Sequence, residues 1–126
     1  MDHLKQIQKN PTFLKSTIIA ARGFVQVFRS ERKIRFAFVV TSVCLILARV
    51  AKASDLEVLL ILFAWVQVIV GEIFNTSLEK AMDYASDKEY HPLIKRAKDY
   101  AAASVFVLSL LASYISLFIL GTRFFA

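Results

Sequence analysis

Four side chains that can bind cations or share protons follow an apolar run in the middle of the chain. Glu72, Asn75, Glu79 and Asp83 stand at i, i+3, i+7 and i+11, so a helix of 3.6 residues per turn places them on one face. The run before them, residues 56–70, is long enough to form the body of a membrane span. A carboxylate near the middle of a bilayer costs roughly 3 kcal/mol or more. A lone acid could simply pair with a basic neighbour and lock helices together, but a stripe of three acids favours a chemical function.

These residue types suit the transfer of a phosphoryl group. Mg²⁺ prefers oxygen ligands and is usually held by one or two carboxylates together with substrate phosphates. A carboxylate in apolar surroundings is a better base for an attacking hydroxyl. With Glu72 deep in the membrane, Glu79 shallower and Lys98 near the surface, a hydroxyl in the lipid could meet a nucleotide in the cytoplasm. The spacing therefore suggests this arrangement.

The composition indicates an all-α integral membrane protein. Hydrophobic residues make up 57% of the 126 residues, which is too high for an ordinary soluble domain of this size. The apolar runs reach about 17 to 20 residues, the length of a helical span, whereas a barrel strand alternates over about ten. The sequence contains no P-loop, no dinucleotide-binding glycine motif, no cysteine–histidine metal spacing and no nucleophile elbow. We expect one domain, residues 1–126.

The distribution of basic residues predicts the orientation of this domain. Eight of the 16 lysines and arginines precede Phe36 and five lie in residues 80–98, whereas the turn at 52–57 has one lysine against two acids. Basic residues concentrate on cytoplasmic segments. We therefore expect a multi-pass protein of the bacterial inner membrane, with the N-terminus and the 84–98 loop cytoplasmic and the C-terminus outside. The remaining positive charge suits anionic membrane lipids, and no nucleic-acid partner is expected.

The hydrophobic pattern predicts a surface helix followed by three spans. In residues 12–30 an apolar stripe that includes Leu14 and Ile18 has a basic flank, which is typical of a helix lying in the membrane surface. The spans are expected at about 34–52, 56–84 and 93–121. Pro92 suits the first turn of the last span. The alanines and serines of that span permit close helix packing or oligomerisation.

The polar motifs resemble a known family of membrane enzymes. Glu72-Ile-Phe-Asn75-Thr-Ser-Leu-Glu79, then Asp83, fits the pattern E-x-x-N-x-x-x-E-x-x-x-D. It is followed by Glu89-Tyr-His91 and Arg96-Ala-Lys98-Asp99, which supply H-x-x-x-x-x-A-K-D. Together these closely resemble the small prokaryotic membrane kinases, diacylglycerol kinase and undecaprenol kinase, over nearly the whole chain. The segment Ser30-Glu31-Arg-Lys-Ile-Arg35 falls where that family has its N-terminal acidic motif.

The resemblance implies a homotrimer with composite active sites at the cytoplasmic interface, which use ATP, Mg²⁺ and a lipid alcohol. It implies that Glu72 is the general base for the lipid hydroxyl and that Arg35 also meets the lipid substrate. It implies that Glu31 and Glu79 hold Mg²⁺ with the ATP phosphates and that Asp83 supports the site. The residues that it places around ATP are Glu31, Asn75, Glu79, Glu89, Tyr90, His91, Lys98 and Asp99.

Residues 91–99 bear on the choice of acceptor lipid. The run His91-Pro-Leu-Ile-Lys-Arg-Ala-Lys-Asp99 looks more like the undecaprenol kinase branch, which favours undecaprenol over diacylglycerol. Diacylglycerol kinases have an arginine and a tyrosine facing the nucleotide where simple alignment places Thr12 and Ile19 here. Lys15 or Arg22 could replace those contacts.

Two hypotheses from other classes compete with a kinase. A small proton-coupled transporter could use Glu72 as its proton-carrying carboxylate, but it would not account for the additional acids or for Lys98 and Asp99. A structural subunit or membrane scaffold would tolerate the loss of Glu31, Asn75 and Glu79 together.

Overall fold

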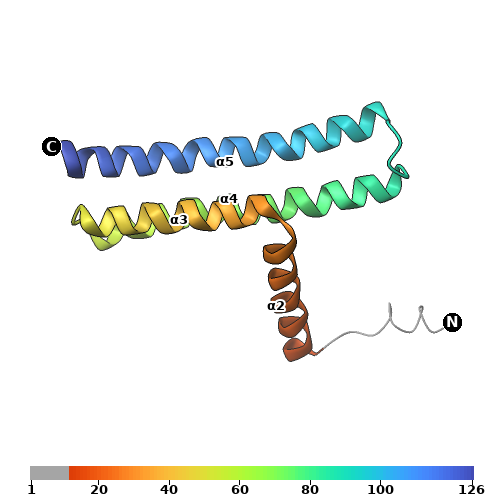
Figure 1. The fold of residues 1–126 in the computed structure, drawn as a ribbon, viewed down its shortest axis with the longest axis horizontal. Helices are drawn as coiled ribbons and strands as arrows, with labels where there is room; N and C mark the ends of the chain where they lie inside the picture. Colours follow the sequence, from red (N-terminus) through yellow and green to blue (C-terminus); the bar gives the residue numbers. More distant parts are fainter. Residues whose placement is uncertain (1–11) are drawn as a thin grey trace. The chain divides into compact units, whose positions relative to one another are not determined.

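A computed structural model describes residues 12–126, and all regular structure in this part of the chain is helical. The helices are α2 (Phe13–Ser30), α3 (Arg32–Val50), α4 (Asp55–Ala85) and α5 (Pro92–Phe125), as Figure 1 shows. The described chain divides after Arg32 into two compact units, one with α2 and the other with α3, α4 and α5. The expected all-α class is confirmed. Lys5 and Lys9, part of the predicted basic N-terminus, lie outside the described residues.

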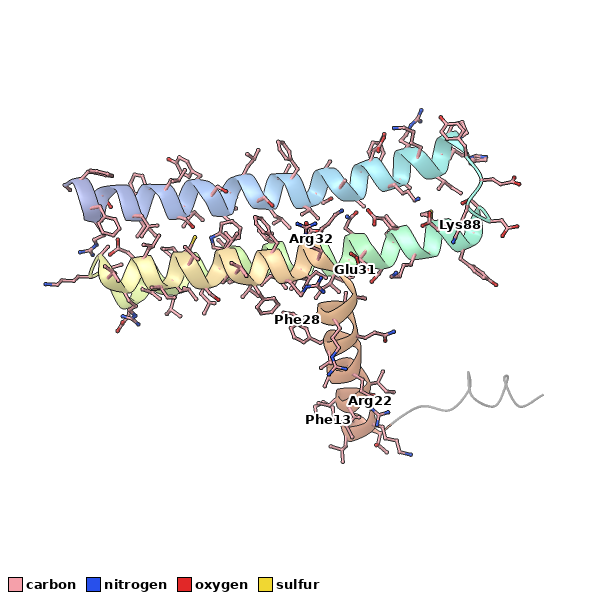
Figure 2. All side chains as sticks on the ribbon, in the orientation of Figure 1. Phe13, Arg22, Phe28, Glu31, Arg32 and Lys88 are labelled. Atoms are coloured by element: carbon pink, nitrogen blue, oxygen red, sulfur yellow. The ribbon has the colours of Figure 1, made fainter. Side chains whose placement is uncertain are left out.

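Helix α2 has the features of an amphipathic helix without a protein core of its own. Thr12 caps its start, because the hydroxyl accepts a hydrogen bond from the Lys15 backbone N–H at 3.3 Å. None of its residues is buried, and Phe13 is 90% exposed. Phe13, Phe28 and Arg22 project from α2 in Figure 2. A helix that leaves large apolar side chains uncovered needs another apolar medium, so its placement in a membrane surface remains our prediction.

In the second unit, α4 and α5 run side by side and antiparallel, joined by a short loop (Figure 1). The buried residues of α3 lie along one side of the helix: Ile34, Ala37, Thr41 and Ala48. Small residues recur in the core, where Ala48, Ala64 and Ala112 pack beside Ile61 and Trp65. Small side chains let helix backbones approach closely, which is the main source of packing between helices in lipid.

Two contacts between α4 and α5 are especially close. The Trp65 indole N–H donates a hydrogen bond of 2.8 Å to the Ser116 hydroxyl, and both side chains are buried. Further along α4, a Cβ placed on Gly71 would lie 2.9 Å from Leu108 Cδ1. Gly71 therefore leaves room for the Leu108 side chain of α5 at the residue directly before Glu72.

Ion pairs link the helices at the end opposite the α4–α5 loop. Ser54 and Glu57 form a reciprocal capping box at the start of α4. The Arg123 guanidinium near the end of α5 forms an ion pair with the Glu57 carboxylate, including an Nε–Oε1 contact of 3.0 Å. Arg49 of α3 contacts Asp55 at 2.9 Å. These contacts fix the turn between α3 and α4 against the end of α5.

Helices α4 and α5 are each long and apolar enough to cross a membrane. In the most apolar 18-residue stretch of each helix, only 28% of α4 and 22% of α5 is buried. Most of this apolar surface therefore faces outward. Among the described residues α3 does not meet the same criterion, since Arg32, Lys33, Arg35 and Arg49 occupy its two ends. A third span and the orientation of the termini remain predictions.

Candidate active site

The predicted polar stripe lies on the second half of α4, which is one uninterrupted helix. Asn75 is buried at 4% exposure, while Glu72, Glu79 and Asp83 are half-buried. The Asn75 side-chain amide donates a hydrogen bond of 3.3 Å to Glu79 Oε1. This contact between adjacent turns orients the Glu79 carboxylate, and it leaves the Asn75 carbonyl oxygen available to another donor.

Two acceptor atoms of the stripe are buried without a hydrogen-bond partner among residues 12–126: Glu72 Oε2 and Asn75 Oδ1. Buried polar atoms are nearly always satisfied in native proteins, because leaving one without a partner costs about 1–3 kcal/mol. The two atoms are one helical turn apart. An alcohol hydroxyl or a cation supplies what such oxygens need, so the chemistry of this donor set fits a hydroxyl substrate and a magnesium ion.

The charged groups that act on Glu72 come from two helices. The negative charge of Glu79 on α4 and the positive charge of Lys33 in the first turn of α3 both act on the Glu72 carboxyl group. Lys33 could not be predicted from the sequence, because it stands among several basic residues and no pattern distinguishes it from them. A lysine near an intramembrane glutamate lowers the cost of burying a carboxylate and can also attract an anionic phosphate.

At the end of the stripe, next to the loop that joins α4 to α5, an ion pair links the two helices. Lys98 Nζ contacts Asp83 Oδ1 across the two helices. Within α5, Lys95 contacts Asp99 at 2.7 Å. Lys98 and Asp99, both expected at the nucleotide, are thus each held by an oppositely charged partner.

A hollow of about 390 Å³ opens beside this ion pair. It gathers several of the residues expected at ATP, namely Glu89, Tyr90, His91 and Lys98. Two further lysines in its lining, Lys88 and Lys95, were missed by sequence reasoning. Tyr90 is 77% exposed, so its ring is open to a ligand. The basic lining suits a polyphosphate.

His91 has a structural contact as well as its place in the hollow. It is the N-cap of α5, and its Nδ1 accepts a hydrogen bond of 3.2 Å from the Leu93 backbone N–H. The sequence signal for this contact was the following Pro92, which begins the helix. A ring nitrogen used in capping leaves Nε2 for any contact with a ligand.

Glu31 and Arg35 lie on opposite sides of the division between the two units. The Glu31 backbone N–H bonds to the Val27 carbonyl at 2.9 Å and closes α2, whereas Arg35 belongs to α3. Residues 12–126 contain no group of three or more acidic, histidine or cysteine side chains arranged to hold a metal. A magnesium ion would therefore need substrate phosphates among its ligands, as is usual for this ion.

Comparison with known proteins identifies the class of enzyme. The sequence model of the family described as prokaryotic diacylglycerol kinase matches residues 18–120. The chain belongs to this family. It is 32% identical to the undecaprenol kinase of Bacillus subtilis over 118 residues, which cover 94% of this chain and 93% of the relative. Diacylglycerol kinases of Helicobacter pylori and Pseudomonas aeruginosa are 34% and 31% identical, over 67% and 75% of this chain and 76% of each relative.

Membership of the family confirms the resemblance seen in the motifs and makes the chain a lipid kinase. It also accounts for the combination of apolar helices with a polar stripe. The two hypotheses from other classes, a proton-coupled transporter and a scaffold, are not needed to explain the acids of α4.

Proposed function

We propose that this protein transfers the γ-phosphate of ATP to the hydroxyl of undecaprenol at the inner face of the bacterial cytoplasmic membrane. The single observation that carries the site is the pair of buried acceptors, Glu72 Oε2 and Asn75 Oδ1, on a helix apolar enough to cross a membrane. Undecaprenol is favoured over diacylglycerol because the undecaprenol kinase of Bacillus subtilis aligns along 94% of the chain. The alternative acceptor is diacylglycerol.

In the proposed reaction Glu72 is the general base. Its carboxylate accepts the proton of the lipid hydroxyl as the hydroxyl oxygen attacks the γ-phosphorus, and the bond to the β,γ-bridging oxygen breaks to release ADP. Half-burial beside an apolar helix keeps water away from this carboxylate, which favours transfer to the alcohol over hydrolysis. Arg35 would hold the acceptor lipid near the base.

The remaining polar residues would hold the nucleotide. Glu79, oriented by Asn75, and Glu31 would hold Mg²⁺ together with the ATP phosphates, and the bound ion would neutralise phosphate charge. Lys98, with Asp99 beside it, would meet the phosphates. The hollow at the loop, lined by Glu89, Tyr90 and His91, would take the rest of the nucleotide.

We further propose that the active protein is a homotrimer with composite sites. Large apolar residues remain exposed on α4 and α5, including Phe63, Phe74 and Phe106 at 66%, 73% and 64%. Such surfaces are suited to lipid or to a neighbouring copy. Chemical cross-linking in lipid vesicles should give a ladder that stops at three copies, and a ladder that stops at one or two would contradict the trimer.

The proposed function is tested by one assay on purified protein in lipid vesicles. The wild type should transfer labelled γ-phosphate to undecaprenol faster than to diacylglycerol, each presented at the same mole fraction. Glu72→Gln should lower the turnover number by at least about 100-fold, since loss of a general base removes 10²–10⁴-fold in rate. Glu57→Gln is the matched control, because it makes the same change at the opposite end of the same helix.

Each alternative gives a different result in this assay. Faster transfer to diacylglycerol would reverse the choice of acceptor. Equal rates for Glu72→Gln and the wild type would remove Glu72 as the base. Phosphate transfer to neither alcohol would contradict the proposed function as a whole.

A further inference from the structure

The ion pair of Asp83 with Lys98 joins two helices that are separated by a loop. Asp83 lies in the last turn of α4 and Lys98 in the second turn of α5. The two side chains are partly shielded, at 44% and 34% exposure respectively. A lysine side chain has four flexible methylene groups, so contact with a fixed carboxylate restricts where its ammonium can lie.

Asp83 also fixes the beginning of the loop. Its backbone carbonyl accepts a hydrogen bond of 2.9 Å from the Lys88 backbone N–H. Lys88 has a left-handed backbone with φ of 61°, and Figure 2 places it in the loop between α4 and α5. The same residue thus holds the Lys98 side chain and the loop backbone that carries Glu89, Tyr90 and His91.

The surroundings of the Asp83 carboxylate are basic. The positive charges of Lys98, Lys88 and Lys80 interact electrostatically with this carboxylate. A carboxylate surrounded by this much positive charge is a poor ligand for a divalent cation, because the lysines repel the ion. Asp83 is therefore unlike Glu79, one turn earlier on α4, whose side chain contacts the neutral Asn75 amide. Its charge is directed to a lysine.

We propose that Asp83 is a positioning residue that holds the Lys98 ammonium at the edge of the hollow, where Lys98 would meet the ATP phosphates. Both side chains line that hollow. This inference rests on the proposed function, in which Lys98 contacts the phosphates and Asp83 acts through it. Without Asp83 the Lys98 side chain samples other rotamers, so ATP binds more weakly, while the distance between the base and the acceptor hydroxyl is unchanged.

The test compares steady-state kinetics of full-length variants in vesicles at saturating lipid alcohol. Asp83→Asn should raise the KM for ATP about fivefold and leave kcat within about twofold of the wild type, as expected for loss of a binding contact. Asp83→Glu keeps the negative charge, so its KM for ATP should stay close to that of the wild type. In the Lys98→Met background, Asp83→Asn should have no further effect, because the group that it positions is gone.

Asp87→Asn is the control, because Asp87 is an exposed loop acid whose left-handed backbone, with φ of 55°, also suits asparagine. It should leave the kinetics unchanged.

Three results would overturn the inference while leaving the proposed function intact. A lower KM in Asp83→Asn would mean that the carboxylate merely repels ATP. An unchanged KM with a lower thermal unfolding midpoint would mean that the ion pair is only structural. An equal rise in KM in the wild-type and Lys98→Met backgrounds would mean that Asp83 does not act through Lys98. A wild type that phosphorylates neither alcohol would instead overturn the proposed function and this inference with it.

Discussion

The hydrogen bond between Trp65 and Ser116 allows a quantitative test of how α4 and α5 are held together. Ser116→Ala removes the acceptor but keeps the small side chain, so the indole N–H of Trp65 loses its partner at a site where Trp65 is 8% exposed. Hydrogen bonds between membrane helices average about 0.6 kcal/mol and reach about 1.7. The short distance of 2.8 Å and the burial of both groups place this one in the upper part of that range. We expect Ser116→Ala to lower the free energy of unfolding by about 1–1.5 kcal/mol.

The assay is reversible unfolding in mixed micelles at fixed protein concentration, followed by near-ultraviolet circular dichroism. Ser109→Ala deletes the same hydroxyl about two turns away on α5 and is the matched control, with an expected loss below about 0.5 kcal/mol. Trp65→Phe and the double variant complete a mutant cycle, in which the coupling energy between the two sites should be about 1 kcal/mol.

A coupling energy near zero would refute the reasoning, as would equal losses for Ser116→Ala and Ser109→Ala. Either result would mean that shape packing alone, and not this hydrogen bond, holds the two helices at this level.

Three further predictions concern the packing, the opposite end of the helices and the metal. Gly71→Val should lower the unfolding free energy by about 1–3 kcal/mol and slow phosphate transfer, because even a Cβ at this position would lie only 2.9 Å from Leu108 Cδ1. Gly121→Val is the control and should have neither effect, because a Cβ at that position would lie in open space. Glu57→Gln should lower the thermal unfolding midpoint by weakening the contact with Arg123, yet kinase turnover should persist; an unchanged midpoint would contradict a stabilising ion pair. Removing Mg²⁺ with a chelator should abolish phosphate transfer reversibly without unfolding the protein, as measured by circular dichroism before and after Mg²⁺ is restored.

Periodicity in the sequence was sufficient to predict the helical class and the stripe on α4. The spacing of Glu72, Asn75 and Glu79 is a property of one helix, so it survives whatever the neighbouring helices do. The contact of Asn75 with Glu79 follows from that spacing, since residues four apart on a helix are neighbours.

Contacts between helices were beyond the reach of the same pattern. Trp65 and Ser116 are 51 residues apart, and nothing in their local sequence relates one to the other. Lys33, Lys88 and Lys95 could not be predicted in this way, because the direction of a long lysine side chain depends on tertiary structure and not on periodicity. The pattern of one helix likewise does not determine how many copies assemble, so the homotrimer remains a proposal.

The uninterrupted length of α4 sets where each step of the reaction can take place. At 1.5 Å per residue its 31 residues extend about 46 Å, whereas the hydrocarbon layer is about 30 Å thick. If Asp55 lies at one boundary of the hydrocarbon layer, Glu72 would lie about 26 Å along the helix axis, inside that layer. Glu79 would lie about 36 Å along the axis, outside it. If Glu72 and Glu79 act as proposed, we therefore expect turnover to depend on bilayer thickness. In a thinner bilayer of lipids with shorter acyl chains, Glu72 would lie closer to water, and in a thicker bilayer it would lie deeper in the hydrocarbon layer.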